Sequence, residues 1–357
     1  MHLKESDLPE GYLNYVWKKM IFLIGSLIFL IFAIAVSVSV GAVNIPLPEV
    51  FNVLLGNAPS STWHTIIWNI RLPQALTGVA AGIGLAVAGV AMQSILRNPL
   101  GSPFTLGISN AGAFGAAFAV MVLGTGTMRS RAMDAIVINN PYTTTIAAFI
   151  FCLIATAFIL GIAHIKKASP EVMILAGVAL SSLFTAGTMF LQFFADDVQL
   201  AAVVFWAFGD VARADWRELS IISTVVILAT IYFFINRWNY NAIDAGDETA
   251  LGLGVDVTRI RLIGMIVSSL VTAVIVAFLG VIGFVGLVCP HIVRNLIGDD
   301  NRFLIPGSVL IGGILLSLSD TAARLIVAPH VLPVAILTAF MGAPVFIFLL
   351  IRGGRRK

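Results

Sequence analysis

Arg97-Asn98-Pro99-Leu100-Gly101-Ser102-Pro103 is a short polar interruption between two long runs that carry no charged side chain, Leu72–Leu96 and Asn98–Met128. An unpaired backbone amide or carbonyl costs several kcal/mol in hydrocarbon, so a Pro-Gly-Pro break beside apolar spans is expected at an interface or along a cavity. We therefore interpret this segment as the inner mouth of a pathway through a membrane.

The composition places the rest of the chain in a membrane as well. Of the 357 residues, 59% are apolar and 11% are charged, and the mean hydropathy is +1.00. About 20 apolar residues cross a bilayer as a helix, and nine uncharged runs are near or above that length. The run from Leu262 is too long and too glycine-rich at Gly280, Gly283 and Gly286 to be one helix. Splitting it predicts an all-α, polytopic protein with about ten transmembrane helices in one domain, residues 1–357.

The basic residues orient these helices. With the amino terminus in the cytoplasm and sides alternating, most of the 21 lysine and arginine residues fall inside, as the positive-inside rule requires. Residues 1–19 are then a cytoplasmic tail, 237–261 a cytoplasmic loop, and the carboxyl terminus is also cytoplasmic. Cys152 and Cys289 lie in apolar runs, where small packing residues are expected rather than a disulfide.

Two features of the run before the break suggest close helix packing and a polar pathway. Gly78 and Gly82 form a small-xxx-small pair, which lets neighbouring helices approach closely. Gln93 is the strongly polar side chain deep in this span, and such a group either bonds to a neighbour or faces a pathway.

A series of motifs makes the chain resemble a known family. In order along residues 65–351, they are Arg71-Leu72-Pro73, the break at Arg97–Pro103, Leu106-Gly107-Ile108-Ser109-Asn110-Ala111-Gly112-Ala113, Leu175-Ala176-Gly177-Val178-Ala179-Leu180, Ala250-Leu251-Gly252, Gly283-Phe284-Val285-Gly286-Leu287-Val288-Cys289-Pro290-His291, Asp320-Thr321-Ala322-Ala323-Arg324 and Gly342-Ala343-Pro344-Val345-Phe346. The chain resembles the permeases of binding-protein-dependent ABC importers for iron-siderophore complexes, haem and vitamin B12. The resemblance implies a homodimer in the cell membrane, with two ATPase subunits inside and a substrate-binding protein outside.

The resemblance assigns a cytoplasmic gate to the break and to the inner turn near residue 169. The expected gate residues are Asn98, Pro99, Leu100, Gln93 and Ser169. Pro99 disfavours helical geometry at Asn98, so the chain can turn there. Small hydroxyl residues are usual in the family beside Ser169, so Pro170 departs from its pattern.

The resemblance also assigns ATPase coupling to the stretch that begins at Gly246. Asp247, Glu248, Ala250, Leu251 and Gly252 are the expected coupling residues. Acidic residues ahead of Ala-Leu suit the start of a short helix, and the following glycines permit a reversal. An ordinary solvated loop is the alternative.

Docking of the binding protein is expected through Arg71, Gln74 and Arg324 on the outer face. The family usually reads Arg-Leu-Pro-Arg here, and this chain has Gln74 in place of the second arginine, which removes one long-range charge. Arg324 also follows Asp320 by four residues, so an internal ion pair is the alternative. The uncharged piece Val198–Gly209 is too short to span, so it predicts either an interfacial or a re-entrant helix. The resemblance implies a short helix over the outer mouth here.

Several functions are disfavoured by missing motifs. The sequence has no Gly-Lys step and hence no P-loop, so ATP hydrolysis is expected on another chain and the protein is not expected to be an enzyme. No cofactor, metal site or nucleic-acid surface is indicated. An ion-coupled secondary transporter is the main alternative, although such carriers usually need ionisable residues near the bilayer midplane. For the cargo, a ferric chelate ranks first, cobalamin second and haem third.

Overall fold

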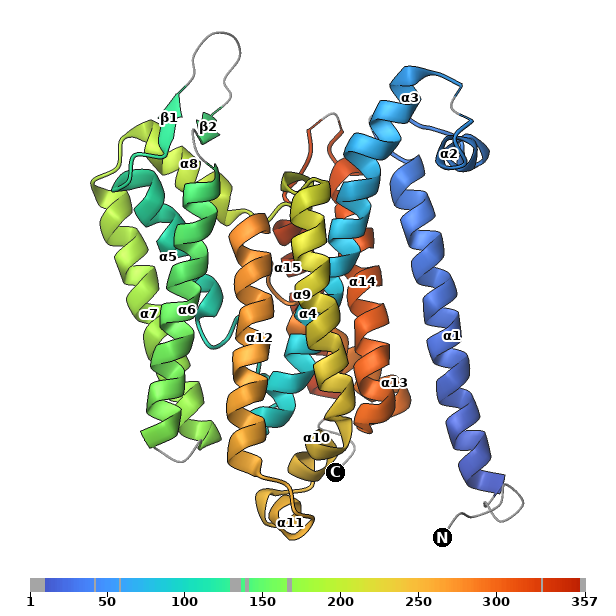
Figure 1. Cartoon of the computed structure of the whole chain (residues 1–357), viewed down its shortest axis with the longest axis vertical. Helices are drawn as coiled ribbons and strands as arrows, with labels where there is room; N and C mark the ends of the chain where they lie inside the picture. Colours follow the sequence, from blue (N-terminus) through green and yellow to red (C-terminus); the bar gives the residue numbers. More distant parts are fainter. Residues whose placement is uncertain are drawn as a thin grey trace.

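The computed structural model describes residues 10–41, 43–57, 59–128, 136–138, 141–165, 169–328 and 330–353. Most helices run along one common direction (Figure 1). We call the two ends of the molecule the α11 end, where α10 (Arg237–Asp244) and α11 (Asp247–Gly252) lie, and the α2 end, where α2 (Leu47–Leu54) and α3 (Ser61–Thr65) lie.

Within the described ranges, seven helical segments are long and apolar enough to cross a membrane. They comprise α1 (Glu10–Ser39), the continuous helix that ends as α4 (Leu72–Ile95), α6 (Pro141–Ile165), α7 (Pro170–Phe193), α9 (Trp216–Ile235), α12 (Val257–Leu279) and α14 (Asn301–Leu325). Three shorter apolar helices accompany them: α5 (Ile108–Met121), α13 (Val285–Ile297) and α15 (Val334–Gly353). Together they make the ten passages that the sequence predicts.

The predicted split of the long run after residue 262 is confirmed. The helix α12 ends at Leu279, and α13 begins at Val285. Between them Gly280 has φ 82° and Phe284 has φ 67°, which is left-handed backbone geometry that an α-helix cannot contain. The Leu279 carbonyl accepts a hydrogen bond from the Asp210 amide at 2.8 Å, so the break is satisfied by a neighbouring segment.

Two boundaries are set by the structure. The uncharged run from Asn98 becomes helical only at Ile108, because residues 98–107 form turns that precede α5. At the α2 end, α3, a π-helical segment (Ile66–Arg71) and α4 form one continuous helix. Arg71 therefore lies within a helix.

The α2 end carries two small elements. The strands β1 (Gly126–Met128) and β2 (Ile136–Ile138) pair antiparallel, with Gly126 opposite Ile138. The helix α8 (Asp197–Ala207) lies near them (Figure 1) and confirms the short helix expected in this stretch. An Asp196–Gln199 capping box fixes its start.

The helix α4 is the centre of the packing, since nearly all of its residues are buried and α9, α12, α13 and α14 all contact it. Glycine makes two of these contacts possible. A Cβ atom on Gly82 would lie 2.2 Å from the Gly312 carbonyl oxygen of α14, and one on Gly89 would lie 1.8 Å from the Gly286 carbonyl oxygen of α13. Gly78, the other member of the predicted pair, has its nearest neighbouring atom at 3.9 Å and permits no comparable approach.

The two cysteines behave as predicted. Cys152 and Cys289 are both buried and free of a disulfide.

Candidate gate and coupling site

The helix α4 ends in a Schellman motif at the α11 end. The Asn98 amide donates to the Gln93 carbonyl at 3.1 Å, and the Arg97 amide donates to the Ser94 carbonyl at 3.1 Å. Glycine is usual at the left-handed position of this motif, but here the residue is Arg97, with φ 45°. A residue with a side chain in the left-handed conformation costs about 1–2 kcal/mol of folding free energy, so the backbone at Arg97 is strained.

The predicted gate residues form a compact turn directly after this motif. The Asn98 side-chain oxygen accepts a hydrogen bond from the Leu100 amide at 2.9 Å, and the Asn98 carbonyl accepts one from the Gly101 amide at 2.9 Å. This is the side-chain turn that asparagine commonly makes. Pro99 and Leu100 are exposed, with 42% of Leu100 accessible. We call residues 98–100 the gate turn.

Gln93, Asn98 and Pro99 line a cavity of about 370 Å³, which Arg97, Asp244, Arg294 and Asp299 complete. The Gln93 side chain is held at both ends, because its amide group donates to the Leu287 carbonyl at 3.3 Å and its oxygen accepts from Arg294 at 2.8 Å. Arg294 in turn pairs with Asp299 at 2.7 Å. The structure thus brings Gln93, Asn98 and Pro99 together.

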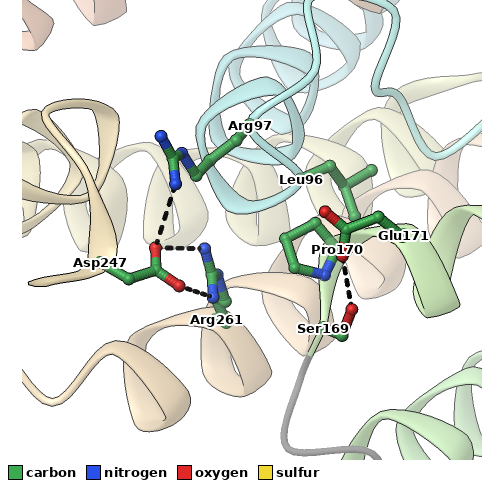
Figure 2. A pocket seen from close by; sticks show the side chains of 7 residues that line it. All are labelled: Leu96, Arg97, Ser169, Pro170, Glu171, Asp247 and Arg261. Atoms are coloured by element: carbon green, nitrogen blue, oxygen red, sulfur yellow. Dashed lines mark hydrogen bonds and ion pairs between the residues drawn. The ribbon is translucent and has the colours of Figure 1, made fainter.

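Ser169 lies in a different cavity, which has a volume of about 530 Å³ (Figure 2). Its lining residues are Leu96, Arg97, Ser169, Pro170, Glu171, Asp247 and Arg261. The Ser169 hydroxyl donates to the Glu171 carboxylate at 2.5 Å. Arg97 is the residue that lines both cavities.

The stretch 237–261 contains two short helices, α10 and α11, and then the first turn of α12; α11 is the short helix expected after Gly246, and α10 was not expected. Ala242, Ile243, Ala250 and Val257 form a small apolar core beneath them. Ala250 is completely buried, whereas Leu251 is 62% and Leu253 is 70% exposed. Glu248 and Gly252 are also exposed. Of the predicted coupling residues, Ala250 therefore supports the helix, and Leu251 presents an apolar surface at the extreme α11 end (Figure 1).

Asp247 points back toward the membrane helices. It accepts hydrogen bonds from both terminal nitrogens of Arg261, at 2.7 and 2.8 Å, and lies 3.8 Å from Arg97 (Figure 2). The Arg261 Nε atom donates to the Ile95 carbonyl at 3.1 Å. The sequence interpretation missed Arg261, and the available signal was a basic residue just inside an apolar span.

Asp244 makes a second connection between α10 and the end of α4. Its carboxylate accepts from the Ser94 hydroxyl at 3.0 Å and from the Asn301 amide group at 2.9 Å. The side chain borders a cavity and is solvent-accessible there, but protein atoms surround much of the carboxylate. This enclosure raises the pKa of the Asp244 carboxyl above its ordinary value, and the hydrogen bonds from Asn301 and Ser94 oppose the rise.

The three residues predicted to dock a binding protein lie together at the α2 end, but they are bound internally. Arg71 is buried and donates to the carbonyls of Val38 at 2.9 Å and Ser39 at 2.8 Å, and also to that of Val43. These carbonyls follow or end α1, so Arg71 caps that helix.

Arg324 and Gln74 meet on Asp320. Arg324 forms the internal i,i+4 pair with Asp320 at 3.2 Å, and Gln74 donates to the same carboxylate at 2.9 Å. Arg324 also donates to the Ser37 hydroxyl at 2.7 Å and to the Val40 carbonyl at 3.1 Å. The structure does not present these groups as free surface charges, because the carbonyls of α1 and the Asp320 carboxylate occupy them.

The arrangement of the site suits the transmission of movement between helices. Within the described ranges, no group of three or more His, Cys, Asp or Glu side chains is arranged to hold a metal ion. The polar residues at the α11 end instead form ion pairs and hydrogen bonds between separate helices. Such an arrangement can transmit a displacement from α11 to the end of α4.

Comparison with known proteins decides the family. The model of the FecCD transport family matches residues 29–352. This chain belongs to the FecCD transport family. It is therefore a multi-pass protein of the cell membrane and a permease subunit of an ABC importer, a class in which separate ATPase and substrate-binding subunits are partners.

Several members of the family are similar over most of their length. A putative ABC transporter permease of Methanocaldococcus jannaschii is 53% identical over 98% of this chain and 99% of its own. The hemin transport permease of Yersinia pestis is 35% identical over 92% and 95%, and the vitamin B12 import permease of Vibrio vulnificus is 32% identical over 82% and 85%. A solved inward-facing structure of a putative metal-chelate type ABC transporter superposes with a TM-score of 0.80, at 28% identity over 92% of this chain and 98% of that one.

Proposed function

We propose that this permease imports a ferric-siderophore-type iron complex, working as a homodimer with two ATPase subunits on the cytoplasmic side and a substrate-binding protein on the other. The observation that carries the proposal is a pair of exposed leucines, Leu251 on α11 and Leu253 at its C-cap. Asp247 of the same helix is connected to the end of α4 through Arg261. An exposed leucine pair of this kind suits docking into a groove of a partner.

The orientation of the chain in the membrane follows from the proposed docking of α11 to an ATPase subunit. The α11 end is cytoplasmic, and both termini lie on that side, as the distribution of basic residues favours. The chain acts as one permease domain, residues 1–357, surrounded by lipid. The iron complex is cargo, and no resident cofactor is required.

Gln93, Asn98, Pro99, Leu100 and Ser169 form the cytoplasmic gate in this proposal. The accessible Leu100 side chain is the group that meets its counterpart near the dimer axis. A Leu100→Cys variant should crosslink between protomers, with a yield that depends on nucleotide. Absence of a crosslink in every nucleotide state would remove Leu100 from the gate.

The binding protein docks at the α2 end. Because Arg71, Gln74 and Arg324 are occupied internally, they act indirectly, by holding the end of α1 against α4 and α14. The docking surface itself is then formed by the segments that these residues support.

The test is reconstitution with the ATPase subunits and binding protein in proteoliposomes. ATP-dependent uptake should be observed with a labelled ferric siderophore, while cobalamin and haem serve as competing cargoes. Uptake of only one of those two would reassign the substrate. Uptake driven by an ion gradient without ATP would instead favour the secondary transporter.

A further inference from the structure

We propose that Arg261 is a positioning residue that joins α11 to the end of α4, so that a displacement of α11 moves the gate turn. The inference rests on the proposed docking of α11 to an ATPase subunit and adds the residue that carries the motion onward. Arg261 contacts neither cargo nor nucleotide in this scheme, and it acts through Asp247 and Ile95.

The geometry around Arg261 is specific to a guanidinium group. Its side chain is only 4% exposed, and all three of its nitrogens donate hydrogen bonds. Two go to the two oxygens of Asp247 on α11, and the third goes to the Ile95 carbonyl on α4. Bidentate pairing of this kind is stronger and more directional than a single hydrogen bond, so the two helices are held in a fixed relation.

The Ile95 carbonyl lacks the backbone donor that a continuing helix would supply. In a continuing helix it would accept from the amide four residues later, but that residue is Pro99, which has no N–H. Arg261 therefore satisfies the carbonyl that the gate-turn proline leaves without a helical donor. The same proline thus ends the helix and creates the attachment point for Arg261.

A second connection runs in parallel. Asp244 on α10 accepts from Ser94, the residue before Ile95, and from Asn301 at the start of α14. The short-helix pair is therefore bound to the last turn of α4 at two consecutive residues. Displacement of the pair must turn or shift that last turn as a unit.

The residue that would respond to a displacement of α11 is Arg97, which lies directly after the last turn of α4. Arg97 is held at φ 45°, a costly conformation, and its contact with Asp247 is a 3.8 Å ion pair whose arginine side chain is 47% exposed. Exposed ion pairs of this kind contribute little to stability, so this contact can break and re-form. The 530 Å³ cavity between Asp247 and Ser169 gives the pair room to shift.

The test compares Arg261→Lys with Arg259→Lys in the reconstituted complex. Lysine keeps the positive charge but cannot form the fork that binds Asp247 and Ile95 together. Arg259 lies two residues earlier on α12, and its side chain is exposed, so it is a matched control. The measurements are copurification of the ATPase, cargo imported per ATP hydrolysed, and amide hydrogen exchange of residues 93–101 with and without nucleotide.

Arg261→Lys should still copurify with the ATPase, import at least tenfold less cargo per ATP than Arg259→Lys, and lose the nucleotide response of amide exchange at the gate turn. Equal import per ATP in the two variants would overturn the inference and leave the proposed function standing. If the unmodified chain neither binds an ATPase nor imports cargo with ATP, the proposed function fails as well. Should Arg261→Lys fail to fold, Asp247→Asn is measured in its place, with the same expected and contrary results.

Discussion

Gly82→Ala tests the packing of α4 against α14, and Gly78→Ala on the same face supplies the control. An added Cβ at residue 82 would lie 2.2 Å from the Gly312 carbonyl oxygen, 2.7 Å from its carbonyl carbon and 3.1 Å from the Gly313 Cα. All three atoms belong to backbone, so no side chain can move aside. The helices must separate by roughly 1 Å before dispersion contacts at this crossing become ordinary again.

The magnitude follows from two opposing effects. Overpacking a close contact typically costs about 1–3 kcal/mol, whereas replacing glycine by alanine inside a helix returns about 0.5–1 kcal/mol. Gly82→Ala should therefore destabilise the protein by roughly 1–2 kcal/mol. At residue 78 the nearest atom is at 3.9 Å, an ordinary contact, so Gly78→Ala should be neutral or stabilising by up to about 1 kcal/mol.

The assay is thermal unfolding of both variants and the unmodified protein in the same detergent, with SDS-induced unfolding as a second measurement. Gly82→Ala should unfold at a lower temperature and lower SDS fraction than Gly78→Ala. If Gly82→Ala is as stable as Gly78→Ala, the close α4–α14 crossing is not a feature of the folded protein.

Three further predictions concern the two ends of the molecule. Arg324→Ala should cost about 3–5 kcal/mol of stability because it leaves Asp320 buried without its cation, and this loss of stability should depend little on salt. A variant that keeps its stability and shows only a salt-dependent loss of binding-protein affinity would contradict the internal role of Arg324. Because its folded pKa is raised, Asp244 contributes stability that is present below the ordinary carboxyl value of 3.8 and is lost as pH rises through the raised pKa. Asp244→Asn, which keeps an oxygen for the Ser94 and Asn301 bonds, should flatten this part of the stability profile, and an unchanged slope would refute the assignment. Leu251→Asp should abolish stimulation of the ATPase while membrane insertion, measured by detergent-extracted yield, stays normal; retained stimulation would remove Leu251 from the docking surface.

Local chemistry was sufficient for several features of this protein. Membrane placement follows from composition, and the break at Pro99 follows from a residue that lacks an N–H and restricts its predecessor. The acidic start and glycine end of Asp247–Gly252 likewise predict a short helix without knowledge of any partner. These signals lie within a few residues of the structure that they determine, so the sequence alone was enough.

Only the tertiary structure decided which residues meet across the fold. Arg71 and Arg324 were expected to be docking charges, with an internal pair to Asp320 as the alternative for Arg324. Carbonyls at the end of α1, 32 residues from Arg71 and 284 from Arg324 in sequence, occupy both side chains. Gly78 and Gly82 are equivalent by spacing, yet the crossing point of α14 makes only Gly82 a close contact. Arg261 reaches Ile95 across 166 positions of sequence. The physical reason is common to all three: hydrogen-bond distances and backbone clearances depend on how the helices cross. Local sequence patterns do not specify those crossings.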